Sequence, residues 1–340
     1  MSVPLTEAPP VAGGVARGAR LAFALALAAA FVVTLGRLDP ARAWASVVGV
    51  HGAWLIAATL CYLTILPLWA WQWHLLAPRA RSQTFSAMLR VVTTTSGVLN
   101  TTPLLVGEAT GVVLLVTVTG LERTTALSLL AMDQLLVGIA KLVVLATAAL
   151  LAPLPDWMAR AALGLILAVA ALGALLLIGA FRGAWRSTAR QVTSSVKPAP
   201  AASVRARVAR ALDALPTALS PLRSPRRGGG ALALALVKKG VEVCAMICMQ
   251  RAFGFDLPVG AAILALGMLN LSTLLPIVPG NVGVYEAAVV LAYARYGVSP
   301  EEGLGLAALQ HLCYLVALAA PGVLWAGAAR WWRASQVRRG

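Results

Sequence analysis

Charged residues are scarce in this sequence. They make up 12% of its 340 residues, whereas a soluble domain carries roughly 25%, and 60% of the residues are hydrophobic. A water-soluble fold cannot hide so much apolar surface. The composition therefore excludes a cytosolic enzyme, a secreted disulfide-stabilised domain and, despite a formal net charge of +16, a nucleic-acid-binding domain. It indicates a multi-pass protein of an inner or plasma membrane.

Cysteine is also scarce, and the common catalytic motifs are lacking. The four cysteines lie inside apolar stretches. Cys244 and Cys248 share a helix face, but two thiols alone make a poor metal site. The sequence contains no Gly-x-Ser-x-Gly, no His-Glu-x-x-His and no phosphate loop. We therefore expect no catalytic residue, no metal and no cofactor.

Long apolar runs dominate what is present, and a membrane-spanning helix needs about 20 apolar residues. The first run is shorter, but Arg20 and Arg37 flank it and can reach the interface. Trp69, Trp71 and Trp73 are predicted to lie in an interfacial aromatic belt. The six predicted spans are 21–36, 43–78, 126–152, 160–181, 231–251 and 304–328.

Lysine and arginine predict the orientation of these spans. The segment from Arg182 to Arg227 holds ten of them against one acid, and arginines recur in the tails 1–19 and 331–340. We expect all three segments, and hence both termini, in the cytoplasm. The basic segment satisfies the positive-inside rule and would contact anionic headgroups. Alternatively, it docks a soluble or membrane-bound biosynthetic enzyme.

Two further apolar stretches, 91–119 and 259–296, must enter and leave the membrane on one side. A full crossing by either would place a basic loop or tail outside. Proline and glycine interrupt each stretch and break a helix there. We predict two re-entrant helical hairpins, the first entering from the cytoplasm and the second from outside. The predicted break residues are Pro103, Gly107, Pro276, Pro279, Gly280 and Gly283.

The expected fold is an all-α polytopic membrane protein with about six full spans and two re-entrant hairpins, or about eight spans by hydropathy. Each hairpin has a Leu-Asn pair, a break and then a lone glutamate, Glu108 or Glu286. Such elements, entered from opposite faces, indicate an inverted repeat. Its halves are residues 20–181 and 230–330, joined by the loop 182–229. Broken helices at membrane depth imply a polar cavity.

Polar residues near the breaks and in the facing helices are the candidates for lining this cavity. Glu108 and Glu286 would lie in the first turn of a half-helix, where a carboxylate favours the helix dipole. The same position lets them contact a cationic or hydroxylated headgroup. The candidates are Glu108, Asp133, Gln134, Lys141, Asn281, Tyr285, Glu286, Gln310 and His311.

Several charged residues have two interpretations. Lys141 either binds a lipid phosphate or neutralises an acid on a neighbouring helix. Lys238 and Lys239 either pair with Glu242 one turn further along the helix or meet phosphates of the inner leaflet. His311 is either a hydrogen-bonded core residue or a proton-coupling group.

Two motifs resemble a known family. Pro103-Leu-Leu-Val-Gly-Glu108 and Leu275-Pro-x-x-Pro-Gly-x-x-Gly-x-x-Glu286, the latter followed by Gly297-Val-Ser-Pro300, are similar to the transmembrane, flippase-like domain of lysylphosphatidylglycerol synthases. The resemblance extends over roughly residues 15–330. It implies a domain that moves lipids, such as aminoacylated phosphatidylglycerol, between leaflets. It also implies a stand-alone member without the soluble aminoacyltransferase domain of the full-length synthases.

The chain departs from the family pattern where arginines are usual. The family usually has arginine at the position of Leu105, near Gly111 and at the position of His311. It reads Glu-Arg-x-x-Asp where this chain has Asp133-Gln134. Arginine is the natural bidentate ligand for phosphate. The departures favour a less charged substrate, such as a glycolipid or polyprenoid, or a degenerate member.

These observations predict a translocase for lipids or lipid-linked glycans, with membrane lipids as its partners. No nucleotide-binding motif is present, so transport would run downhill or be coupled to an ion. One alternative is a non-transporting accessory subunit that anchors an enzyme of lipid, glycolipid or hopanoid biosynthesis through the basic segment. Another is an intramembrane transferase, for which the sequence alone identifies no base.

Overall fold

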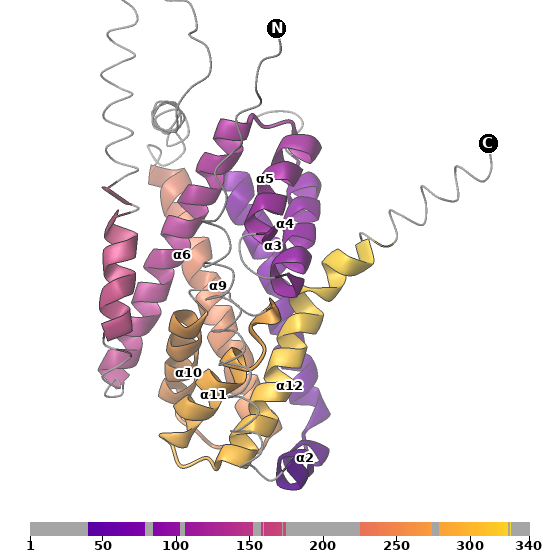
Figure 1. Ribbon diagram of the computed structural model, residues 1–340, viewed down its shortest axis with the longest axis vertical. Coiled ribbons are helices and arrows are strands. Elements are labelled where there is room, and N and C mark those ends of the chain that lie inside the picture. Colours follow the sequence, from indigo (N-terminus) through magenta and orange to yellow (C-terminus); the bar gives the residue numbers. More distant parts are fainter. Residues whose placement is uncertain are drawn as a thin grey trace, which may run out of the picture.

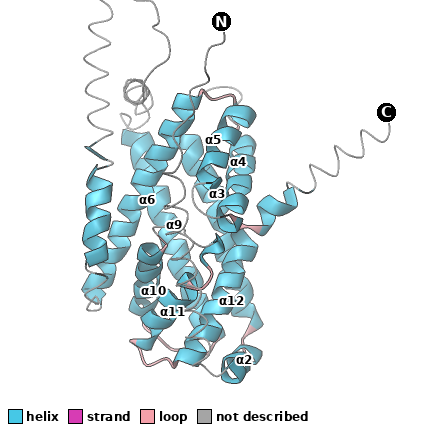
Figure 2. Cartoon of the chain, in the orientation of Figure 1, coloured by secondary structure: helices cyan, strands magenta, loops and turns pink. Residues whose placement is uncertain are grey.

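A computed structural model describes residues 40–78, 84–102, 106–151, 158, 160–171, 173–174, 225–273, 279–325 and 327 (Figure 1). Within these ranges all regular secondary structure is helical (Figure 2). The helices are α2 (Pro40–Val48), α3 (Gly52–Leu76), α4 (Phe85–Thr101), α5 (Val106–Thr119), α6 (Arg123–Leu151), α9 (Pro225–Ala252), α10 (Val259–Ser272), η2 (Pro279–Asn281), α11 (Val284–Ala294) and α12 (Pro300–Leu318).

Among the described residues, three helices are long and apolar enough to cross a membrane: Gly52–Leu76, Arg123–Leu151 and Pro300–Trp325. They correspond to the predicted spans 43–78, 126–152 and 304–328. The predicted span 231–251 lies in α9, which is 28 residues long but carries charged side chains in its middle. The span 21–36 and the tails 1–19 and 331–340 lie outside the described residues. So do residues 172 and 175–181 of the predicted span 160–181, and residues 182–224 of the basic segment.

The antiparallel pair of α3 and α9 forms the centre of the bundle, with the most extensive contact between any two described helices. At one end the His51 amide donates to the Ala252 carbonyl at 2.9 Å. At the other end the Leu75 side chain lies against Gly230. Fully buried alanines on both helices allow their backbones to approach closely, as is common where helices pack within lipid. These are Ala58, Ala70, Ala231, Ala235 and Ala245.

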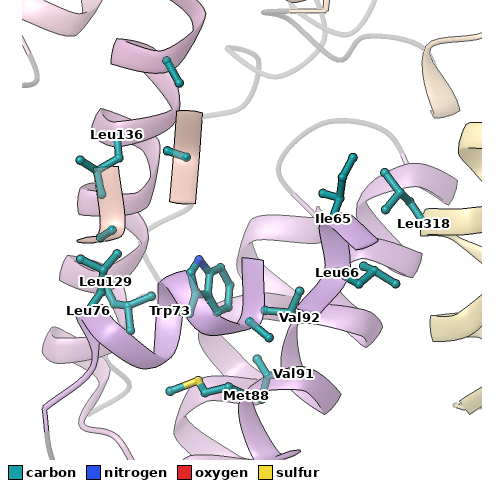
Figure 3. Close-up of a cluster of buried hydrophobic side chains, with 14 of the residues drawn as sticks. Ile65, Leu66, Trp73, Leu76, Met88, Val91, Val92, Leu129, Leu136 and Leu318 are labelled. Carbon is teal, nitrogen blue, oxygen red and sulfur yellow. The ribbon is translucent and has the colours of Figure 1, made fainter. Parts of the chain in front are cut away.

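A cluster of buried apolar side chains ties this centre to its neighbours (Figure 3). Trp73 of α3 is its largest fully buried member. Met88 and Val92 of α4 and Leu129 of α6 belong to the same cluster. The cluster fixes α4 and α6 against α3.

Two short helix pairs approach the middle of the bundle from opposite ends. The α4–α5 pair lies in the upper half of Figure 1 and the α10–α11 pair in the lower half. Their inner ends meet. A Cβ added to Gly280 in η2 would lie only 3.1 Å from the carbonyl oxygen of Asn100, near the end of α4. The ends of both predicted hairpins are therefore neighbours.

The backbone between α10 and α11 turns through left-handed conformations. The φ angles of Gly280, Asn281 and Gly283 are 63°, 56° and 87°, values that glycine and asparagine adopt most readily. Glu286, in the first turn of α11, then accepts the Gly283 amide at 2.6 Å, which caps the helix. Pro279 begins η2, whereas Pro276, like Pro103 in the first hairpin, lies outside the described residues.

Gly107 has a different role from the one predicted. It is the second residue of α5 rather than part of the break. A Cβ there would lie 2.6 Å from the Cα of Leu99 on α4, and a Cβ at Gly111, one turn later, 3.2 Å from Thr95. Small residues at this spacing let two helices pack closely inside a membrane.

The close contact of α4 with the C-terminal part of the last helix gives the first prediction. A Cβ at Gly322 would clash with the carbonyl oxygen of Thr93. Overpacking of this kind costs roughly 1–3 kcal/mol, so Gly322→Ala should lower the detergent-solubilised protein's midpoint of heat-induced aggregation. Gly327→Ala is the matched control, because a Cβ there meets nothing within 4 Å. Equal midpoints for the two variants would contradict the packing described.

Candidate functional site

A cavity of about 330 Å³ lies at the meeting point of the two helix pairs. Its size is within the range of small-molecule sites. The walls come from α3, α4, α5, α6, α9, α10, η2, α11 and α12. Its polar and charged lining residues are Thr95, Ser96, Asn100, Glu108, Asp133, Gln134, Lys141, Lys238, Lys239, Glu242, Asn270, Thr273, Asn281 and His311.

Most of the residues predicted from the sequence meet at this cavity. Glu108, Asp133, Gln134, Lys141, Asn281, Tyr285 and His311 all line it. Glu286 and Gln310 do not. Each instead forms a hydrogen bond with a residue that does: Glu286 with His311, and Gln310 with Tyr285. These two residues therefore act behind the cavity wall.

Some residues that line the cavity were not among the candidates predicted from the sequence. Trp69 and Trp73, predicted for an interfacial belt, line the cavity, and Trp73 is 1% exposed; the belt prediction is wrong for Trp73. Trp69 and Trp73 are one helical turn apart, and this spacing was the sequence signal that both lie on the same face of α3. Asn100 and Asn270 also line the cavity. Their position in the repeated Leu-Asn pairs was the sequence signal that could have identified them.

Asp133 is held by a partner from α3. Gln72, fully buried, donates its amide to Asp133 Oδ1 at 2.9 Å. The Lys238 ammonium lies 5.6 Å from the centre of the Trp69 ring and interacts electrostatically with Asp133. A buried carboxylate needs such partners, because an isolated charge in the membrane is costly.

Lys239 connects α9 to α10. Its ammonium donates to both oxygens of Glu242, at 2.9 and 2.8 Å, and to the Asn270 side-chain oxygen at 3.2 Å. Of the two interpretations, the intrahelical ion pair therefore holds for Lys239 but not for Lys238. Lys141, on α6, forms no hydrogen bond or ion pair with any described residue, so its ammonium can bind a ligand.

Aromatic rings surround His311. Its imidazole stacks on Tyr285, with ring centres 4.1 Å apart and planes inclined by 10°, and Tyr314 lies 6.3 Å away. The Gln310 amide donates to the Tyr285 hydroxyl at 2.8 Å. His311 Nδ1 lies 2.7 Å from Glu286 Oε1. The side chains of α11 and α12 thus fix one another.

Several lining side chains keep a buried polar atom without a hydrogen-bond partner in the described part of the chain. Among them are Glu108 Oε2, Asn270 Nδ2, Thr95 Oγ1 and His311 Nε2. Native proteins leave few such atoms unpaired. The lining also balances its formal charge, with three carboxylates (Glu108, Asp133 and Glu242) against three lysines (Lys141, Lys238 and Lys239). The cavity therefore offers donors, acceptors and both charges to a polar ligand.

An all-helical bundle with helices long and apolar enough to cross a membrane, and with a polar cavity inside it, defines a class: multi-pass helical membrane proteins. A family model described as the lysylphosphatidylglycerol synthase TM region matches residues 19–322, and this chain belongs to that family. Comparison with curated proteins and with solved structures gives no match.

Two buried tyrosines on α11 provide a matched pair for the second prediction. Tyr285 and Tyr293 each accept a hydrogen bond from a glutamine amide, Gln310 at 2.8 Å and Gln250 at 3.2 Å. Tyr285→Phe and Tyr293→Phe each leave a buried amide unpaired, which costs roughly 1–3 kcal/mol. Both should therefore lower the thermal midpoint. Of the two, only Tyr285 lines the cavity, so only Tyr285→Phe should also weaken ligand binding; equal binding by both variants would contradict this assignment.

Proposed function

We propose that this protein is a translocase that moves the polar headgroups of lipids, or of lipid-linked glycans, between the leaflets of its membrane. The observation that carries the proposal is the charge-balanced polar cavity buried where the α4–α5 and α10–α11 pairs meet. A headgroup would pass through it while the acyl chains stay in the bilayer. Membership of a family defined by a membrane region supports a transporter rather than an enzyme.

The proposed topology treats both short helix pairs as re-entrant hairpins. The order of helix ends supports it: α3 ends, α4 begins, α5 ends and α9 begins at the upper end of Figure 1, whereas α9 ends and α12 begins at the lower end. In this proposal the basic segment before α9 lies in the cytoplasm, as the positive-inside rule favours. The upper end of the bundle and both termini would then face the cytoplasm, and the membrane would be an inner or plasma membrane. Non-helical backbone such as η2 is tolerated at that depth only against protein or a cavity.

The lining indicates how a headgroup would be held. Lys141 supplies an ammonium for a phosphate, and Glu108 Oε2 accepts from a hydroxyl or ammonium group. Tyr62, Trp69 and Tyr314 provide aromatic surface, which packs well against the apolar face of a sugar. Since acids and lysines balance, the cavity suits a headgroup that is zwitterionic or rich in hydroxyls more than one of high net charge.

Leaflet exchange in liposomes tests the function and forms the third prediction. The purified chain would be reconstituted with labelled aminoacyl-phosphatidylglycerol, phosphatidylglycerol or a neutral glycolipid, and an impermeant quencher would report leaflet exposure. Glu108→Gln should lower the rate of leaflet exchange of the transported lipid by about tenfold or more, because a hydrogen bond to a charged group is worth roughly 1.5–3 kcal/mol. Glu122→Gln, at an exposed position just before α6, is the matched control and should leave the rate unchanged.

Failure to move any of these lipids, with the protein shown to be folded, would overturn the translocase proposal. Attention would then move to the accessory-subunit alternative. A pull-down with and without the basic segment 182–227 would test for a soluble or membrane-bound biosynthetic enzyme as partner. An anchor should tolerate Glu108→Gln and lose its partner when that segment is deleted.

A further inference from the structure

The imidazole of His311 is held in one tautomer. Glu286 Oε1 lies 2.7 Å from His311 Nδ1, and Glu286 Oε2 accepts the Gly283 amide at 2.6 Å. An ionised carboxylate can only accept hydrogen bonds. We therefore assign the ring proton to Nδ1, so that Nε2 of the neutral imidazole carries a lone pair.

The ring is also fixed in position. Tyr285 covers one face at 4.1 Å, and Gln310 fixes the Tyr285 hydroxyl. His311 lines the cavity, and its Nε2 is buried without a hydrogen-bond partner in the described part of the chain. With Nδ1 bound to Glu286, Nε2 is the one ring atom left to exchange a proton.

The charged and titratable groups around His311 come from every helix packed on α12. On α11 these are Tyr285 and Glu286, and Glu286 is the carboxylate in direct contact. The α4 arginine, Arg90, lies over the Trp325 ring, well beyond His311 along the last helix, and α2, which carries Arg42, packs at the lower end of the bundle in Figure 1. The others are Tyr62 on α3, Tyr314 on α12, and, across the cavity, Lys238, Lys239 and Glu242 on α9, Asp133 and Lys141 on α6 and Glu108 on α5.

A formal charge count shows what a proton would change. The lining itself is balanced, and Glu286 behind it adds one negative charge when His311 is neutral. Protonation of Nε2 converts the pair to imidazolium and carboxylate and removes that excess. An uncompensated charge inside a membrane protein is costly, so proton uptake is favoured there. The new Nε2–H also adds a donor to the cavity.

We propose that the Glu286–His311 pair is a proton-binding site and that headgroup movement is coupled to it. An N–H bond forms at His311 Nε2 as hydronium on one side of the membrane gives up its proton. The Nε2–H donates to an acceptor oxygen of the headgroup, and the proton returns to water on the other side when the headgroup leaves. The coupling rests on the proposed translocase function, whereas proton binding by the pair does not. Glu286 is a positioning residue in this step, because it acts through His311.

Titration of the imidazole, the fourth prediction, tests the proton site without transport. The full-length chain would be labelled with 15N-histidine, and the His311 signals assigned by comparison with His311→Gln. We expect a neutral ring with its proton on Nδ1 at about pH 8 and an imidazolium at about pH 5. A ring that keeps one protonation state across that range, or that carries its neutral-state proton on Nε2, would overturn the proposal.

A pH gradient across the liposomes tests the coupling. For one proton per lipid, each unit of gradient should bias the leaflet distribution by about tenfold toward the alkaline side. Glu286→Gln should reduce this bias. Glu302→Gln should not, because Glu302 holds the equivalent capping position on α12 at an exposed site away from the cavity.

The outcomes separate the two proposals. Exchange that is unaffected by the gradient would overturn the coupling and leave the translocase function standing. Absence of exchange under every condition would overturn the translocase function, and the titration would still decide whether the pair binds a proton.

Discussion

The rule that backbone polar groups cannot face lipid unpaired governs this structure. A helix broken inside a membrane must place its free ends against protein or a cavity. Here the end of α4 and the η2 turn lie against each other, with Gly280 close to the Asn100 carbonyl, and Glu286 satisfies the Gly283 amide. The polar cavity follows from the same constraint, because side chains near these ends gather where water and polar ligands can be accommodated.

Charge compensation within the bundle links stability to function. Gln72 and Lys238 stabilise Asp133, and Glu242 pairs with Lys239. Glu286 caps α11 with one oxygen and orients His311 with the other. A structural and a functional interpretation of that glutamate are therefore not in competition.

The sequence predicted an all-helical membrane bundle, and most of the polar residues that it singled out line the cavity, because helix breaks and buried charges in apolar runs carry a local signal. It could not show that Lys239 rather than Lys238 pairs with Glu242, since neighbouring lysines differ only in what other helices place beside them. For the same reason Trp73 looked interfacial, although α4 and α6 bury it. Gly107 looked like a helix breaker because the approach of Leu99 is a tertiary contact.

The close approach of η2 to α4 at Gly280 is made by a main-chain carbonyl, that of Asn100, on the α4 side and by a residue without a side chain on the other. A substitution at Asn100 leaves its carbonyl in place, and any side chain at Gly280 would disrupt the contact. Sequence variation at these two positions can therefore do little to adjust it. The walls formed by α6 and α9, which contribute side chains of both charges, can change residue by residue. Differences in the polar lining of this cavity among related chains are thus expected to arise from substitutions in the walls, while the contact between η2 and α4 remains the same.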